Sequence, residues 1–242
     1  MQEICLYLCP DGGRLSLPLA RNGILQGVFY HLLSSDAALS AAVHDFDDPG
    51  SRVYKYFCFS DLIGNARAAD RQIIYDGPVS WFIRSADDGM LQAVVDSVTA
   101  EPFVRFGGTV CPVASFELRE RVFCSDTVRF SMNTPIAVYQ TDADGTRRFF
   151  TPDNPMFCRI VENNLIRKYA ALSGEEPAET PRFSVLRFSE KDVRRVRYHG
   201  QIITACGGSY SLTAPSAFLE LAYYCGIGSK NAAGLGTIGT IL

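Results

Sequence analysis

Glycines crowd one stretch of this sequence, where residues 226–239 read GIGSKNAAGLGTIG. Gly234, Gly236 and Gly239 have the G-x-G-x-x-G spacing of a dinucleotide-binding turn, which binds a pyrophosphate only where a strand leads into it and a helix N-terminus follows. Only Thr240, Ile241 and Leu242 follow Gly239, and Gly228-Ser-Lys lacks the ending of a phosphate loop. We therefore expect no dinucleotide cofactor here. Two roles remain open: backbone amides and Lys230 attract a phosphate, or the glycines let the loop pack tightly against the first domain.

A second group that could bind phosphate is the stretch RFSEKDVRRVRYH, residues 187–199, which holds five Lys or Arg and two acidic residues. The chain has a net charge of −3, but residues 1–122 contain 10 basic and 15 acidic residues, against 13 and 11 in residues 123–242. Basic side chains neutralise phosphates, so the second half is expected to carry a face for nucleic acid. The alternative is a β-hairpin whose long polar side chains face water.

The cysteines are a third candidate group, and they predict no metal site. None of the eight forms a C-x-x-C pair or has a His at zinc spacing, so we expect reduced, buried, small hydrophobic side chains. No apolar run approaches the roughly 20 residues that span a bilayer. The N-terminus MQEICLYLCPDGG lacks the basic and apolar regions of a secretory signal, which leads us to expect a cytoplasmic protein without membrane contact.

The elements that must position these groups follow one order in each half. The first half reads as strand 4–8, a helical region from Gly23 to about Val43 that Ser35-Asp36 interrupts, strands 53–59 and 79–85, a helix after a capping box at Ser85 and Asp88, and closing strands. The second half begins with strand 134–140 and continues with a helix from Asn154-Pro155 to about Ala171. Further strands, a short helix that Gly226 ends and a final strand complete it.

Each half thus reads strand, helix, strand, strand, helix, strand, which is the ferredoxin-like unit. We predict an α+β protein of two tandem ferredoxin-like (βαββαβ, RRM-like) domains. The first spans residues 1–122, and the second spans residues 123–242 with the basic hairpin and the glycine-rich loop. Paired sheets of this kind suit a single-stranded or hairpin RNA.

Several segments together resemble one family, the CRISPR-associated repeat-processing endoribonucleases (Cas six), a branch of the RAMP superfamily. LQGVFYHLLSSDAALSAAVHDF is similar to the family's first helix and histidine-bearing segment, and YKYFCFSDL to the following strand. NTPIAVYQ and NLIRKYAAL resemble landmarks of the second domain. The most specific match is YYCGIGSKNAAGLGTI, because chance agreement at so many spaced glycines plus Lys-Asn is improbable.

The resemblance implies a metal-independent cut, without a cofactor, in the repeat RNA of a CRISPR precursor transcript. The ribose 2′-OH attacks the adjacent phosphate and leaves a 2′,3′-cyclic phosphate and a 5′-OH. This reaction needs a base, an acid and groups that stabilise the charged phosphorane. Carried over by motif, the histidine is His44, which would act as acid or base, the tyrosine is Tyr30, and the lysine is Lys55. Tyr30 would orient the 2′-OH or a phosphate oxygen, and Lys55 would stabilise the phosphorane.

For RNA binding, the resemblance favours basic residues that follow the backbone. The expected contacts are Arg194, Arg195 and Arg197, with Ser229, Lys230 and Asn231 of the glycine segment. It leaves open other CRISPR effector-complex subunits and a homodimer as partners. His31 and His199 are weaker site candidates.

Plainer interpretations stand beside these assignments. His44 could be an ordinary histidine at a helix end, Tyr30 a core residue and Lys55 the solvent side of a strand. A non-catalytic RAMP subunit that binds guide RNA is the rival function, and a small-molecule-binding tandem ferredoxin-like protein is a third.

Overall fold

The computed structural model describes residues 1–34 and 54–242 of the chain. It divides into two compact units, Met1–Glu120 (unit 1) and Arg121–Leu242 (unit 2), which we describe separately. His44 and the second helical piece expected after Ser35 lie outside the described residues. Across the two described ranges, none of the helices has both the length and the apolar character needed to cross a membrane.

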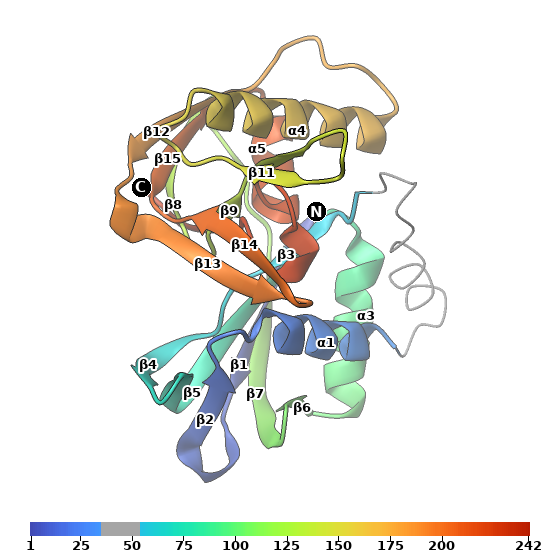
Figure 1. Cartoon of the computed structure of the whole chain (residues 1–242). Helices are drawn as coiled ribbons and strands as arrows, with labels where there is room; N and C mark the ends of the chain where they lie inside the picture. The colour runs from blue at the N-terminus through green and yellow to red at the C-terminus, as the bar shows by residue number, and fades with distance from the viewer. Residues whose placement is uncertain (35–53) are drawn as a thin grey trace. The chain divides into compact units, whose positions relative to one another are not determined.

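Unit 1 builds one seven-stranded sheet and two described helices (Figure 1). In chain order the elements are β1 (Gln2–Leu8), β2 (Arg14–Pro18), α1 (Asn22–Leu33), β3 (Phe57–Phe59), β4 (Ile63–Ala69), β5 (Gln72–Ser85), α3 (Asp88–Ala100), β6 (Phe103–Phe106) and β7 (Thr109–Arg119).

The topology of unit 1 is ferredoxin-like. Strands β5, β1 and β7 lie side by side, and β3 and β4 both pair with the other edge of β5. All of these pairs are antiparallel, and β2 and β6 extend the sheet. Taking β3 and β4 together as the second strand, the spatial order is second, third, first, fourth, as a βαββαβ unit requires.

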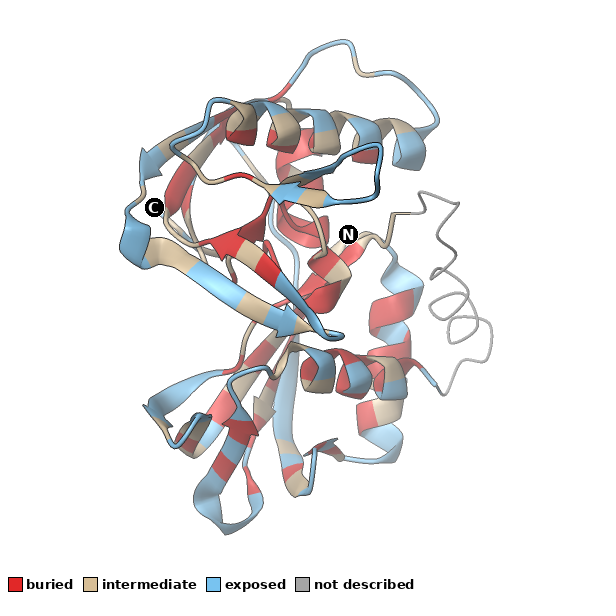
Figure 2. Cartoon of the chain, in the orientation of Figure 1, coloured by how far each residue is buried: buried red, intermediate tan, exposed pale blue. Residues whose placement is uncertain are grey.

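Helix α1 covers the apolar face of this sheet. Ile4 and Leu6 of β1 are opposite Ile83 and Trp81 of β5, and all four are fully buried. The ring of Phe29 on α1 lies 4.7 Å from that of Phe57 on β3, centroid to centroid. Figure 2 shows the matching alternation of buried and exposed residues along β2. The period of two for strands thus places the core where the sequence pattern indicates.

Unit 2 has a four-stranded main sheet and two smaller sheets (Figure 1). Its elements are β8 (Thr127–Met132), β9 (Ile136–Ala137), β10 (Tyr139–Thr141), β11 (Arg147–Phe149), α4 (Met156–Ser173), β12 (Arg182–Arg187), β13 (Val193–Tyr198), β14 (Gln201–Cys206), β15 (Ser209–Thr213), α5 (Ser216–Cys225) and β16 (Ile238–Ile241).

The main sheet of unit 2 repeats the ferredoxin-like order, β12-β15-β8-β16. The β13–β14 hairpin is inserted between the second and third strands of this unit and pairs with β9 in a separate sheet. The stacked rings of Tyr169 on α4 and Phe218 on α5 join the two helices at a centroid distance of 4.8 Å. The prediction of two tandem ferredoxin-like folds in an α+β protein is confirmed.

The predictions for the first strand of unit 2 and for the N-cap of α3 were wrong. The first strand of unit 2 is β8, TVRFSM, whereas TPIAVYQ forms only the short strands β9 and β10 outside the main sheet. The N-cap of α3 is Asp87, whose carboxylate accepts from the Gly89 amide at 2.9 Å, and not Ser85. Ser85 instead closes the end of β5, where its hydroxyl accepts from the Asp87 amide at 2.9 Å.

Candidate functional site

Two residues of the expected site, 25 positions apart in the sequence, meet in unit 1. Lys55 Nζ donates to the Tyr30 hydroxyl oxygen at 3.0 Å and lies 5.5 Å from the centre of the Tyr30 ring. Both side chains are half-buried. Tyr30 comes from the last turn of α1, and Lys55 from the segment before β3. The pair combines a positive charge with a hydroxyl, the groups that stabilise charge on a phosphorus centre.

The backbone beside Lys55 is fixed by the end of the neighbouring strand β5. The Tyr56 carbonyl accepts from the Ala86 amide at 2.9 Å and from the Ser85 hydroxyl at 3.1 Å. Phe57 then enters β3 opposite Ser85. The expectation that Lys55 belongs to a strand over residues 53–59 was wrong in extent, because β3 covers only Phe57–Phe59. Lys55 therefore lies in a connection, where strand alternation does not dictate its direction.

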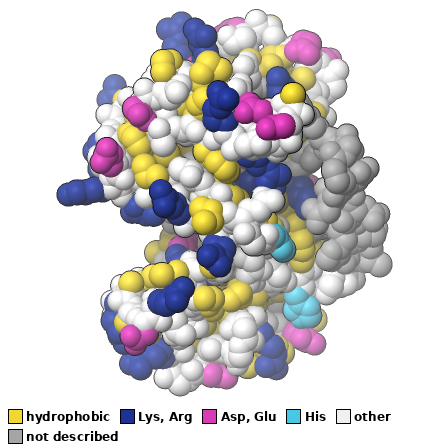
Figure 3. Space-filling view, in the orientation of Figure 1, with side chains coloured by type: hydrophobic (Ala, Val, Ile, Leu, Met, Phe, Trp, Pro, Cys, Tyr) yellow, Lys and Arg dark blue, Asp and Glu magenta, His cyan; other side chains and the backbone are white. Residues whose placement is uncertain are grey.

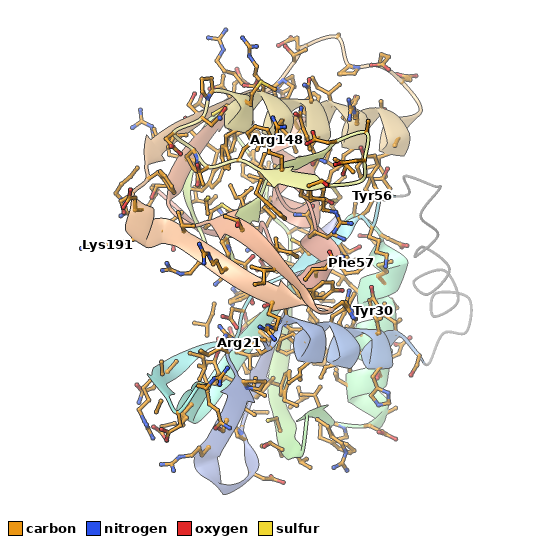
Figure 4. The ribbon with its side chains drawn as sticks, viewed as in Figure 1. Arg21, Tyr30, Tyr56, Phe57, Arg148 and Lys191 are labelled. Atoms are coloured by element: carbon orange, nitrogen blue, oxygen red, sulfur yellow. The ribbon has the colours of Figure 1, made fainter. Side chains whose placement is uncertain are left out.

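The Tyr30 ring is held by aromatic neighbours. Its centroid lies 6.4 Å from that of Phe57 in an edge-on arrangement and 6.2 Å from that of Phe29. Figure 4 labels Tyr30 on α1 and Phe57 on β3. Aromatic pairs at these separations restrict ring orientation. Tyr30 therefore packs against core residues through its ring and presents its hydroxyl at the candidate site.

A half-buried ion pair fixes the other end of α1. Arg21, at the N-cap of α1, donates through Nε to Asp61 at 2.7 Å and through its second nitrogen to the other carboxylate oxygen. Burial raises the pKa of the neighbouring Tyr75 to about 12, so this phenol stays neutral beside the pair. Because Arg21 meets Asp61 and Tyr30 meets Lys55, α1 is tied at both ends to the segment around β3.

Two of the three histidines, His31 and His199, lie in the described residues. His44, the expected acid or base, lies outside them. His31 is exposed on α1, and its carbonyl accepts from the Ser34 amide at 3.0 Å. His199 is exposed in unit 2 at the tip of the β13–β14 hairpin.

The basic stretch forms the hairpin that the sequence indicated. His199 and Gly200 make its two-residue turn with φ values of +46° and +75°. Arg195 and Arg197 are exposed on one face, opposite Thr204 and Ile202. Figure 3 shows Lys and Arg side chains over this part of unit 2. Two guanidiniums two residues apart on one strand face form a regular row of positive charge.

Arg194 does not share that row. It alternates onto the same face as Val196 and Tyr198, which pack against the cluster of Ala137, Ile203, Ala205 and Leu235. Its guanidinium donates to the carbonyls of Lys191 and Val193. The three arginines are therefore not one cluster, because strand alternation separates Arg194 from the other two.

The glycine-rich segment between α5 and β16 packs against residues of its own unit. The amide of Ser229 donates to Ala137 O and that of Gly236 to Pro135 O, both at 2.9 Å. A Cβ at Gly228 would lie 2.7 Å from Ala137 O, and one at Gly236 would overlap the carbonyl oxygen of Ile227. Close backbone approach explains these two glycines, and the partners named here all lie in unit 2.

Asn231 is part of the interior of this loop. Its side-chain oxygen accepts from Lys168 Nζ at 2.6 Å, and its nitrogen donates to Ile227 O and Leu235 O at 3.0 and 2.9 Å. With 6% of its surface exposed and three internal partners, Asn231 serves the loop's own structure, and we do not retain it as an RNA contact. Ser229 and Lys230 are half-buried beside it.

Lys168 is a residue that the sequence analysis missed. It is buried on α4, and its ammonium also donates to Gly226 O at 2.9 Å, just after the C-terminus of α5. A cation is favourable at the negative end of a helix. The signal was present, since Phe157, Val161, Leu165 and Lys168 follow one another at spacings of four, four and three.

The cysteines are only partly as expected. Six are buried or half-buried, but Cys9 and Cys124 are exposed. Burial raises the pKa of Cys111 and of Cys206 to about 12, so these thiols remain protonated near neutral pH. Within the described ranges, no group of three or more His, Cys, Asp or Glu side chains gathers as a metal site.

The chain is similar to proteins of one family in sequence and fold. The family model described as CRISPR associated protein Cas6, C-terminal, matches residues 118–239. The CRISPR-associated endoribonuclease Cas6 1 of Methanocaldococcus jannaschii is 23% identical over 231 residues, which cover 89% of this chain and 83% of that protein.

Two solved structures match over the whole chain. One is described as CRISPR associated protein Cas6, with a TM-score of 0.81, 22% identity and coverage of 100% of this chain and 99% of the other. The second is described as a RAMP protein binding different RNA substrates, with a TM-score of 0.85, 18% identity and full coverage of both chains. Because the family model covers half of the sequence and the fold agrees throughout, this chain belongs to the Cas6 family.

Proposed function

We propose that this protein is a CRISPR RNA-processing endoribonuclease that cuts within the repeat RNA of the precursor transcript in the cytoplasm. The relative in M. jannaschii is named a CRISPR-associated endoribonuclease Cas6, and the present chain belongs to the Cas6 family. The observation that carries the proposal is the 3.0 Å contact between Lys55 and Tyr30, because it joins two distant residues that the chemistry needs.

The proposed reaction is an intramolecular transfer at phosphorus. The ribose 2′-oxygen loses its proton and attacks the adjacent phosphorus, while the 5′-oxygen leaves and takes up a proton. The products are a 2′,3′-cyclic phosphate and a 5′-OH. His44 supplies acid or base catalysis, Lys55 stabilises the negative charge of the phosphorane, and Tyr30 hydrogen-bonds the 2′-OH or a non-bridging phosphate oxygen.

The decisive experiment is cleavage of a labelled cognate repeat RNA in EDTA by the wild-type protein and by His44→Ala. We expect the wild type to cut and His44→Ala to lose about 10²–10⁴-fold in rate, the usual contribution of a positioned acid or base. Product ends are identified by phosphatase sensitivity and mass spectrometry.

Each outcome of this assay has a definite meaning. A wild-type protein that binds the repeat but does not cut it would support the rival, a non-catalytic RAMP subunit. Cutting that depends on an added divalent metal would contradict the metal-independent mechanism. Equal rates for the two proteins would remove His44 from the mechanism.

For RNA binding we propose the row formed by Arg195 and Arg197, with Lys230 and Ser229 as further contacts. The support is geometric, since both guanidiniums are exposed on one strand face. Arg194 is a weaker contact in this proposal, because its guanidinium is bonded to the carbonyls of Lys191 and Val193.

Removing both charges of this row is expected to weaken RNA binding in a salt-dependent way. For Arg195→Ala with Arg197→Ala, the slope of log K against log salt should become shallower by about 0.7 for each lost contact to single-stranded phosphate. Fluorescence anisotropy at several salt concentrations measures this slope.

The matched control removes two exposed arginines of α4, Arg159 and Arg167, from the same unit. It changes the net charge equally and is expected to leave the slope closer to that of the wild type. Equal losses in both double variants would show that the row has no specific role beyond total charge.

A further inference from the structure

The Tyr30 hydroxyl oxygen has a second described donor besides Lys55. Gln26 Nε2 donates to it at 3.1 Å, while Lys55 Nζ donates at 3.0 Å. Gln26 lies one turn before Tyr30 on α1, so the two side chains share a helix face. Two donors from different parts of the chain thus converge on one phenol oxygen.

Gln26 is an unusual residue for its position on α1. Leu25, Val28, Phe29, Leu32 and Leu33 are the other buried residues of this helix, and all of them are apolar. Gln26 has only 9% of its surface exposed. Burying a polar amide is unfavourable unless it makes hydrogen bonds, and its contact with Tyr30 is one such bond.

Counting donors and acceptors shows what this arrangement does to Tyr30. A phenol oxygen has two acceptor positions and one O–H donor, and an ammonium can only donate. With the ammonium and the amide both donating to the oxygen, both acceptor positions are used. The hydroxyl hydrogen must then point away from Gln26 and Lys55.

We propose that Gln26 is a positioning residue for the RNA cleavage reaction. By donating to the Tyr30 oxygen together with Lys55, it directs the Tyr30 O–H toward the reacting phosphate or the 2′-oxygen. This inference rests on the proposed function, and it adds a residue that acts through Tyr30 and does not itself touch the RNA. Donation to the oxygen also polarises the O–H bond and makes it a stronger donor to a negatively charged oxygen.

The test exchanges the donor for an acceptor of the same shape. In Gln26→Glu the carboxylate accepts the Tyr30 O–H and attracts the Lys55 ammonium, so both groups turn away from the RNA. Single-turnover cleavage with saturating protein should slow by about 10²-fold, with RNA affinity nearly unchanged. Gln26→Met, which keeps the volume but donates no hydrogen bond, should slow cleavage by about two- to tenfold, the worth of one neutral hydrogen bond.

A double-variant comparison separates positioning from folding. Because Gln26 acts through the Tyr30 hydroxyl, Gln26→Met should cause no further loss in a Tyr30→Phe background. Gln26→Glu should keep part of its loss there, because its carboxylate also attracts Lys55. Gln92→Glu on α3, which makes the same charge change at an exposed position of unit 1, is the control and should cut like the wild type.

Three results would overturn the inference. The first is a wild-type rate in Gln26→Glu, and the second is a Gln26→Met loss that adds in full to that of Tyr30→Phe. The third applies where Gln26→Glu does not fold, and it is a wild-type rate in a Gln26→Met variant that circular dichroism shows to be folded. A wild-type protein that does not cut contradicts the proposed function itself, so the two failures are distinguishable in one assay.

Discussion

Alanine at Gly236 is expected to destabilise unit 2 by roughly 2–5 kcal/mol. Gly236 has a φ of +74°, a left-handed conformation that a Cβ disfavours. The new Cβ would also overlap the carbonyl oxygen of Ile227 and come within 2.7 Å of Asn231 Nδ2. To relieve this overlap, the backbone of Gly236 or Ile227 must move. That movement would strain the hydrogen bond that Ile227 N donates to Gly236 O at 2.8 Å.

Gly174→Ala is the matched control. Gly174 follows α4 with a φ of +76°, but a Cβ there meets nothing within 4 Å. This variant carries the left-handed strain alone, at about 1–2 kcal/mol. Urea unfolding of the full chain by circular dichroism, with hydrogen exchange of unit 2 amides, compares the two. Equal destabilisation would contradict the close packing of the glycine segment.

The glycine segment shows what sequence spacing can and cannot establish. Its position between α5 and β16 followed from element order, and so did the exclusion of a nucleotide-binding turn. However, Gly228 is packed against the carbonyl of Ala137, which is far away in the sequence, and Gly236 against the carbonyl of Ile227 in the same loop. Such approaches depend on tertiary packing and leave no local pattern beyond the glycine itself.

Polar residues with internal partners were the hardest to assign from the sequence. Asn231 was interpreted as an RNA contact because it stands in the most motif-like stretch. Its side-chain amide instead donates to two carbonyls of its own loop and accepts from Lys168. The spacing of apolar residues along α4 is consistent with a buried Lys168. No local sequence pattern, however, pairs Lys168 with Asn231, which is 63 positions away. Burial of a charge becomes understandable only once its acceptors are known.

The fold was more predictable than the side-chain directions. Hydrophobic periodicity and turn residues gave two βαββαβ units, since these patterns are local. The first strand of unit 2 was missed even though Val128, Phe130 and Met132 alternate in TVRFSM. The strand of the basic hairpin was predicted correctly. Arg194, Arg195 and Arg197 were grouped by their charge alone, although strand alternation puts Arg194 on the opposite face from the other two.

Lys55→Met is expected to reduce the single-turnover rate of RNA cleavage by about 10²–10³-fold, the usual cost of removing one group that stabilises a transition state. Lys55 is the only lysine in residues 1–120, and its ammonium lies 3.0 Å from the Tyr30 hydroxyl. The phosphorane carries more negative charge at its oxygens than the ground-state phosphate. A nearby cation therefore lowers the barrier more than it strengthens RNA binding.

The rate constant at saturating protein and the dissociation constant must be measured separately, by quenched time courses and by anisotropy with a 2′-deoxy substrate. Arg105→Met is the charge-matched control, because Arg105 is exposed on β6 in the same unit and makes an equal change in net charge. We expect the control to cut at the wild-type rate and Lys55→Met to bind RNA within a few-fold of the wild type. Unchanged cleavage by Lys55→Met would mean that its contact with Tyr30 only orders the segment before β3. A loss confined to binding would move Lys55 from the reaction to RNA recognition.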